Sequence, residues 1–233
     1  MKKIYVVITV ILVLFLAYLS LKYMNTANLP IVITFGVLLM LLFSYLYFEK
    51  SRMGTKEIAL IATLSTLAAV CRAVFEPLPN IKPTTFMVAV SGYVFGPYTG
   101  FLIGSTTAFL SNIFLGQGPW TPWQMVAWGL VGFISGILGK NKRKMSALRF
   151  SLLCFFYGFM FDWIMNLWHV LGFVRPITVK TVLLAYLFGL TFDVLHAGSS
   201  FIFSIIFYDK FLKVLLRFKK RMDIQYINEG DIV

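Results

Sequence analysis

Long apolar segments recur through nearly the whole chain, and they constrain its fold more than any other feature. A helix rises about 1.5 Å per residue, so roughly 20 apolar residues cross the ~30 Å hydrocarbon core of a bilayer. Segments of this kind are expected at 4–22, 30–48, 57–75, 84–97, 98–115, 124–139, 149–172 and 181–208. With 59% hydrophobic and 13% charged residues, no room is left for a separate soluble domain. The sequence predicts an all-α integral membrane protein, a polytopic helical bundle.

The segment 84–97 is the weakest part of this predicted topology. It is short for a full crossing, and no charged residue marks the reversal at Gly96-Pro97. A fully spanning helix and a tilted or re-entrant helix are both compatible with the sequence. Eight full crossings would return the chain to the side on which it began.

The first apolar segment begins like a secretory signal peptide, because Lys2 and Lys3 precede an apolar run. The run continues to about Tyr18 without a small-x-small cleavage site, so we expect an uncleaved span. The expected organisation is two additional transmembrane helices in 1–48, a cytoplasmic linker in 49–56, a six-helix membrane core in 57–211 and a basic cytoplasmic tail in 212–233.

The positive charge of the chain is concentrated in alternate connections between the apolar segments. If Met1 is cytoplasmic, the outer connections hold few of the 21 lysines and arginines. These outer cations are Lys22, Arg72, Lys82, Arg175 and Lys180. Such asymmetry is typical of membrane proteins whose positive loops stay inside. It places both termini in the cytoplasm and explains the net charge of +12 without a nucleic-acid partner.

Small residues recur three and four positions apart along the third apolar segment, where they let two helices approach closely. One interpretation is ordinary packing inside the protein, and the other is a docking face for a second membrane protein. The candidate docking residues are Ala59, Ala62, Thr63, Thr66 and Ala69.

Two loops expected on the outer side combine fixed backbone with polar and aromatic groups. The stretch 75–85 has three prolines that prevent a continuous helix, and Arg72 stands four residues before Glu76, where the two can pair. The stretch 116–125 reads GQGPWTPWQM. Its tryptophans fit an interfacial aromatic belt, or, with nearby amides, the wall of a small-molecule site.

Asp162, Asn166 and His169 share one face of the seventh segment, while Asp193 and His196 share a face of the eighth. Charged groups inside a membrane are costly unless paired or hydrated, so these should face the bundle interior. A structural Asp–His network, ligand contacts, a proton relay and metal binding are the alternatives. No HExxH or other metal spacing occurs, which argues against a metalloenzyme. Both cysteines, Cys71 and Cys154, are expected to be small buried hydrophobes.

The sequence has no phosphate-binding G-x-x-x-x-G-K-[ST] motif. The chain therefore cannot hydrolyse ATP by that route. Uphill transport would need an ion gradient or partner subunits.

Three strings carry a resemblance to a known family: PNIKPTT at 79–85, SGYVFGPYTGFLIG at 91–104, and SNIFLGQGPWTPWQMVAWGLVG at 111–132. With the alanine-rich third segment, they resemble the substrate-binding S components of energy-coupling-factor (ECF) vitamin transporters. The resemblance covers about 56–211, and the last string looks most like the branch associated with cobalamin or its precursors. It implies a six-helix core, to which the two N-terminal spans are additional.

The resemblance also implies a mechanism and partners. An S component binds its vitamin near the outer face and delivers it inward with a membrane coupling subunit and two cytoplasmic ATPases. No cofactor is expected, and cobalamin would be a transported ligand. The residues that we expect around the ligand are Arg72, Asn80, Lys82, Asn112, Gln117, Trp120, Trp123, Gln124, Trp128, Asp162, Asn166, His169, Asp193 and His196.

Three other functions compete with capture of cobalamin. An S component could take a different vitamin or heterocycle. An intramembrane enzyme would use Asp162, His169, Asp193 and His196 for acid–base chemistry. A purely structural scaffold would bind no ligand at all.

Overall fold

The computed structural model describes residues 18, 22, 29–50, 54–140 and 145–222, and these form helices and short connections without any strand. The helices are α2 (Leu29–Lys50), α3 (Thr55–Phe75), α4 (Thr84–Phe95), α5 (Pro97–Leu115), α6 (Thr121–Gly139), α7 (Ala147–Phe173) and α8 (Val179–Met222). The all-α prediction is confirmed for this part of the chain. The expected span at 4–22 lies almost entirely outside the described residues.

Five of the described helices, α2, α3, α6, α7 and α8, are long and apolar enough to cross a membrane. A multi-pass membrane protein is therefore confirmed. Helix α4 has only 12 residues, about 18 Å of helix, and ten of them are buried by neighbouring helices. Of the two interpretations of the segment 84–97, the structure favours a short helix enclosed by the protein over a full crossing.

Proline and glycine set the connections on both sides of α4. Pro77, Pro79 and Pro83 lie between α3 and α4, where their missing amide hydrogens and ring geometry stop helix propagation. Between α4 and α5, Gly96 has φ = 99°, a conformation that residues with a Cβ rarely adopt. The chain reverses there without a longer loop, so α4 and α5 are held close together.

Glycines bring the backbones of α4, α5 and α6 into direct contact. A Cβ atom on Gly132 of α6 would collide with the carbonyl oxygen of Gly100 on α5, and one on Gly92 of α4 would collide with that of Gly132. Gly104 faces the backbone of Trp128 in the same way. Small residues permit such close approach in membrane helices. This three-helix contact fixes the depth and rotation of α6.

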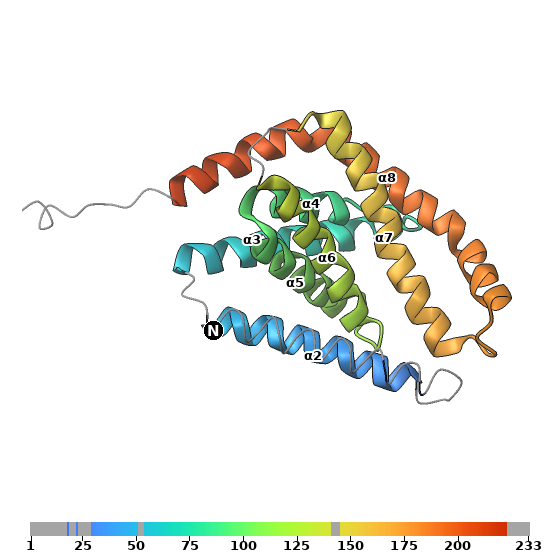
Figure 1. Cartoon of the computed structure of the whole chain (residues 1–233). Helices are drawn as coiled ribbons and strands as arrows, with labels where there is room; N and C mark the ends of the chain where they lie inside the picture. The colour runs from blue at the N-terminus through green and yellow to red at the C-terminus, as the bar shows by residue number, and fades with distance from the viewer. Residues whose placement is uncertain (1–17, 19–21, 23–28, 51–53, 141–144, 223–233) are drawn as a thin grey trace, which may run out of the picture.

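Helices α7 and α8 pack beside each other as an antiparallel pair (Figure 1). Phe150 of α7 stacks on Tyr208 of α8 at 4.5 Å between ring centroids, and both side chains are fully buried. The cysteines are unpaired, with Cys154 buried and Cys71 half-buried. Helix α8 continues without interruption past residue 211, where the expected core ended, to Met222.

Helix α2 packs on α5 and α6 through polar contacts. The Tyr45 hydroxyl lies 3.0 Å from Ser105 Oγ and 2.9 Å from Thr106 Oγ1 of α5. In return, the Tyr98 hydroxyl donates to the carbonyl oxygen of Ser44 at 2.9 Å. Figure 1 shows α2 running along the edge of the bundle beneath α5 and α6. The second apolar segment is thus joined to the core by specific bonds.

Replacing Tyr45 with phenylalanine should loosen this attachment while keeping the ring. Interhelical hydrogen bonds in membrane proteins contribute about 0.6 kcal/mol each on average, so we expect a loss of about 1 kcal/mol and a melting temperature about 2–4 °C lower in detergent. Thr34→Val is the matched comparison, because Thr34 accepts only a long 3.4 Å bond from Trp123. An equal shift in both variants, or no shift in Tyr45→Phe, would contradict this assignment.

Candidate ligand site

A stacked aromatic pair lies where α6 meets α7. Trp128 of α6 is fully buried, and its ring stacks on Phe161 of α7 with centroids 4.1 Å apart and planes 28° apart. The contact of Gly104 with the backbone of Trp128 places this tryptophan at a defined height in the bundle. The two rings form an apolar wall, around which polar side chains from helices α3 to α8 and from the α3–α4 loop are gathered.

A chain of hydrogen bonds leads from this wall to a buried carboxylate. Trp128 Nε1 donates to Thr85 Oγ1 at 3.0 Å, and that hydroxyl lies 2.8 Å from His196 Nε2. His196 Nδ1 lies 2.8 Å from Asp162 Oδ2. Asn80 Nδ2 also donates to the Asp162 carboxylate, with 3.3 Å to each oxygen. The chain joins α4, α6, α7 and α8 to the α3–α4 loop.

The bonding pattern assigns the tautomer of His196. An ionised carboxylate only accepts hydrogen bonds, so Nδ1 of His196 carries the imidazole proton and donates it to Asp162. Nε2 of the neutral ring then accepts from the Thr85 hydroxyl, which itself accepts from Trp128 Nε1. Neutral His196 and ionised Asp162 satisfy each other, which lowers the cost of burying a carboxylate at membrane depth.

Two cations approach the aromatic wall. The guanidinium carbon of Arg72 lies 4.8 Å from the Trp128 ring centroid, and Lys82 Nζ lies 5.8 Å from that centroid and 5.6 Å from that of Phe161. Cations at such distances over aromatic faces are attracted by the ring quadrupole. The site therefore combines two buried aromatic rings with strong donors.

Arg72 keeps unused donor capacity. Its side chain is only 6% exposed. Nη1 donates to Ser111 Oγ at 2.6 Å and to Asn112 Oδ1 at 2.7 Å. Its Nε has no hydrogen-bond partner among the described residues. Asn112 Nδ2 in turn donates to Gln124 Oε1 at 2.8 Å. A buried donor without an acceptor is costly, so a ligand oxygen placed there would be favoured.

Lys82 lies outside the helices, in the α3–α4 loop, and its ammonium group is turned inward over the two rings. The pKa of Lys82 is lowered from its usual 10.5 to about 8, first by burial and then by the charge of Arg72, while Asp162 and Glu76 act in the opposite direction. The folded protein thus releases this proton at a pH where an unfolded chain retains it.

This difference predicts a pH dependence of stability. Between pH 8 and about 10.5 the unfolded chain binds more protons at Lys82 than the folded chain, so its contribution to stability rises with pH. The melting temperature of wild type minus that of Lys82→Met should therefore increase across this window. Lys180→Met, which removes an exposed lysine, is the control and should leave the pH profile unchanged. A flat difference for Lys82→Met would contradict the burial of its ammonium.

A second polar pair adjoins the carboxylate. Asn166 Nδ2 donates to both oxygens of Asp193, at 3.3 and 3.2 Å. Asn80, which holds Asp162, also donates to the carbonyl oxygen of Phe192 at 2.8 Å. This loop residue has φ = 57°, a left-handed conformation that asparagine tolerates. It ties the α3–α4 loop to both helices of the α7–α8 pair.

The structure brings together many, but not all, of the residues expected around a ligand. The cluster contains Arg72, Asn80, Lys82, Asn112, Gln124, Trp128, Asp162, Asn166, Asp193 and His196. Arg72 and Glu76 do not form the expected pair; Arg72 donates to Ser111 and Asn112 instead, and Glu76 is exposed.

Four expected residues lie elsewhere. Trp123 is buried but its Nε1 points to Thr34 of α2. His169 is exposed and stacks on Phe173 near the end of α7. Gln117 is exposed in the α5–α6 loop, where it donates to the carbonyl oxygen of Phe109 and connects to Asn112 only through the Thr121 hydroxyl. Trp120 contacts Trp168 edge to face.

Thr85 and Phe161 are members of the cluster that the sequence did not single out. Thr85 connects the tryptophan to the histidine, and its only signal was its position in PNIKPTT, at the start of a short helix. Phe161 precedes Asp162 in an aromatic-rich segment, where nothing distinguishes it from its neighbours. Both owe their importance to contacts between distant segments.

The candidate docking residues on α3 divide into two groups. Ala59, Ala62, Thr63 and Thr66 are exposed, whereas Ala69 is 1% exposed and packs inside the bundle. The exposed group lies on one side of α3, at spacings of three and four residues. A small-residue face is therefore available on α3, and Ala69 is not part of it.

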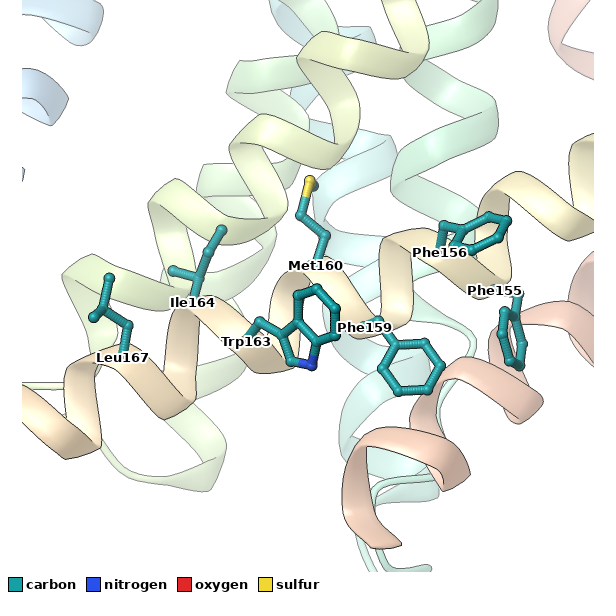
Figure 2. A pocket seen from close by; sticks show the side chains of 7 residues that line it. All are labelled: Phe155, Phe156, Phe159, Met160, Trp163, Ile164 and Leu167. Carbon is teal, nitrogen blue, oxygen red and sulfur yellow. The ribbon is translucent and has the colours of Figure 1, made fainter. Parts of the chain in front are cut away.

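A groove of about 530 Å³ runs along one side of α7, and its lining is almost entirely apolar. Figure 2 shows the seven side chains that line it, all from this helix: Phe155, Phe156, Phe159, Met160, Trp163, Ile164 and Leu167. Several of them, including Phe156 and Trp163, are exposed. A face of this composition suits lipid chains, and it lacks the polar groups of the cluster around Trp128.

Within the described ranges, no group of three histidine, cysteine, aspartate or glutamate side chains could hold a metal ion. The polar cluster is instead built mainly of amides, hydroxyls, cations and carboxylates. Such groups bind organic ligands by hydrogen bonding and stacking.

Comparison with known proteins identifies the family. The family model for "ECF-type riboflavin transporter, S component" matches residues 52–214. A UPF0397 protein of Aliivibrio salmonicida (strain LFI1238) is 27% identical over 133 residues, which cover 55% of this chain and 70% of that protein. One from Aliivibrio fischeri (strain MJ11) is 29% identical over 141 residues, with the same coverage. No solved structure matches the chain. Since the family match spans well over half of its length, the chain belongs to the family of ECF-type riboflavin transporter S components.

Proposed function

We propose that this chain captures a planar vitamin, a flavin in the first place, at the cluster around Trp128. The observation that carries the proposal is the aromatic wall of Trp128 and Phe161, flanked by the partly unsatisfied Arg72 and by Lys82. Membership of a transporter family means that the chain is a binding component and not an enzyme. The carboxylates and His196 then serve binding and positioning.

The chemistry of a flavin matches these side chains. Its flat ring system can stack on an aromatic wall, and its pyrimidine edge alternates carbonyl oxygens with a ring N–H. Arg72 Nε and the Lys82 ammonium supply donors to carbonyls, while amide oxygens from Asn or Gln supply acceptors. The name of the matching family points to the same ligand class.

Cobalamin is the second candidate. The string at 111–132 resembles the cobalamin-type branch, and it contributes Asn112, Gln124 and Trp128 to the cluster. The corrin ring has a rim of amide side chains that could meet the same donors and acceptors. Its macrocycle is broader and less flat than a flavin, so an aromatic pair of the size of Trp128 and Phe161 suits it less.

The proposed partners are a membrane coupling subunit and two cytoplasmic ATPases. The exposed face of Ala59, Ala62, Thr63 and Thr66 on α3 supports docking of the coupling subunit, because small residues let another helix approach closely. Both termini are proposed to lie in the cytoplasm, on the ground of the charge distribution between spans. The ligand cluster would then face the outer side.

Direct binding by the purified chain tests the proposal. Riboflavin titrated in detergent should lose fluorescence on stacking against Trp128, and cobalamin should be titrated in parallel by calorimetry. Trp128→Phe should weaken flavin binding about tenfold, since it removes part of the ring surface and the bond to Thr85. The matched control is Trp168→Phe, which alters a half-buried tryptophan that contacts Trp120 outside the cluster.

The outcomes separate the two candidates. If the chain binds cobalamin but not riboflavin, the proposed ligand is cobalamin and not a flavin. Absence of binding by any vitamin would overturn the proposal, as would equal losses in Trp128→Phe and Trp168→Phe.

A further inference from the structure

The C-terminal part of α8 extends well beyond what one crossing requires. The helix has 44 residues, about 66 Å of length, which is roughly twice the thickness of the hydrocarbon core. In Figure 1 its last part, drawn in red, continues past the start of α7. Its segment 207–222 has three faces: one that packs on the bundle, one that is cationic and one that is apolar and exposed.

The first face holds this segment against the bundle. Leu212 and Leu215 are buried, and the Tyr208 hydroxyl donates to the carbonyl oxygen of Met145 at 3.1 Å. Lys219 Nζ donates to the carbonyl oxygen of Val94 at the end of α4, at 2.7 Å. These contacts fix the rotation of the helix, so the other two faces point in defined directions.

The second face is cationic. Lys210, Lys213, Arg217 and Lys220 follow one another at three- and four-residue spacing, which places them on one side of the helix, and all are exposed. Arg221 lies beside Lys220 and is also exposed. In the sequence from 208 to 222 only one residue is acidic, Asp209.

The third face is apolar although it is not covered by the protein. Phe207, Val214 and Phe218 are seven and four residues apart, so they form a stripe along the helix. Their exposed fractions are 39%, 48% and 50%. The stripe lies between the buried face and the cationic face. A helix with this division of surfaces is typical of one that lies in a membrane interface.

We propose that the segment 207–222 of α8 binds anionic phospholipid headgroups, a contact beyond vitamin capture. Lys213, Arg217 and Lys220 meet the phosphates, and the stripe of Phe207, Val214 and Phe218 enters the adjacent acyl region. Charge complementarity selects anionic over zwitterionic lipid. An acidic protein surface would match the cations but would leave the apolar stripe unexplained, so lipid fits the geometry better.

The test measures which lipids stay with the full chain. The protein is reconstituted in vesicles of phosphatidylcholine and phosphatidylglycerol at 3:1, extracted gently, and its retained lipids are quantified by mass spectrometry. Each cation near an anionic surface contributes about 1 kcal/mol, so neutralising three should reduce the enrichment of phosphatidylglycerol by tenfold or more, until it approaches the bulk ratio. The variant is Lys213→Gln with Arg217→Gln and Lys220→Gln.

The control removes three exposed cations elsewhere: Lys140→Gln, Arg149→Gln and Lys180→Gln. It should keep the enrichment of wild type. A second measurement needs no variant, since 1 M salt during extraction should screen the contact and reduce enrichment in wild type.

Three results would overturn the proposal. One is wild-type protein that retains lipids at the bulk ratio. Another is equal loss of enrichment in the control and the 213/217/220 variant. The third is unchanged enrichment in that variant together with lost association with the ATPase-bearing complex, which would assign the cations to a protein surface. None of these results depends on which vitamin the chain binds.

Discussion

Gly132→Ala is expected to disrupt the packing of α4, α5 and α6. The new methyl group would collide with the carbonyl oxygen of Gly100, a backbone atom that cannot move without displacing α5. Overpacking in protein interiors costs about 1–3 kcal/mol, and backbone collisions belong to the upper end. We expect a melting temperature lower by about 5–10 °C in detergent, and poor recovery of monodisperse protein.

Gly198→Ala provides the matched control. Gly198 lies within α8, and a Cβ atom there would meet no atom within 4 Å. Alanine is the better helix former by about 1 kcal/mol, so this variant should be as stable as wild type or slightly more so. If Gly132→Ala has the same melting temperature as Gly198→Ala, the helix backbones do not approach closely at Gly132.

The second large effect is expected at Asp162. Asp162→Ala leaves the Nδ1 proton of His196 without an acceptor and the Asn80 amide with only the Phe192 carbonyl, and an unsatisfied buried donor costs about 1–3 kcal/mol. Because the same carboxylate holds the α3–α4 loop beside Trp128, we expect binding of the vitamin to weaken at least about a hundredfold. The melting temperature should fall as well, by several degrees.

Two further variants separate charge from packing. Asp162→Asn keeps an oxygen that can accept from His196 Nδ1, so it should lose less stability than Asp162→Ala. Glu49→Gln removes an exposed carboxylate at the end of α2 and should change neither quantity. Vitamin binding at wild-type strength in Asp162→Ala would show that the cluster is structural and that the ligand lies elsewhere.

The helices themselves could be predicted from the sequence because hydrocarbon imposes a length. Segments at 57–75, 98–115 and 149–172 differ by at most two residues at either end from α3, α5 and α7. The continuation of α8 to Met222 could not be predicted in this way. Its cations suggest a polar tail, and only the burial of Leu212 and Leu215 shows that the helix continues on the bundle.

The polar members of the cluster could also be recognised, because a carboxylate or an arginine inside an apolar segment is too costly to be accidental. Their partners could not. Trp123 and Trp128 are close in sequence, yet five residues turn a helix to a different side, and one contacts α2 while the other contacts Phe161. From the sequence alone, both tryptophans are equally good candidates for the ligand site.

The sequence by itself determined a multi-span helical protein without an ATP motif, with polar groups concentrated in its later helices. Tertiary structure alone decided that His196 meets Asp162, that Thr85 joins them to Trp128, and that His169 stays outside. The physical reason is that one segment alone sets whether it is long and apolar enough to cross a membrane and what a charge inside it costs. Partner choice depends instead on the rotation and depth of each helix, which glycine contacts between distant segments set.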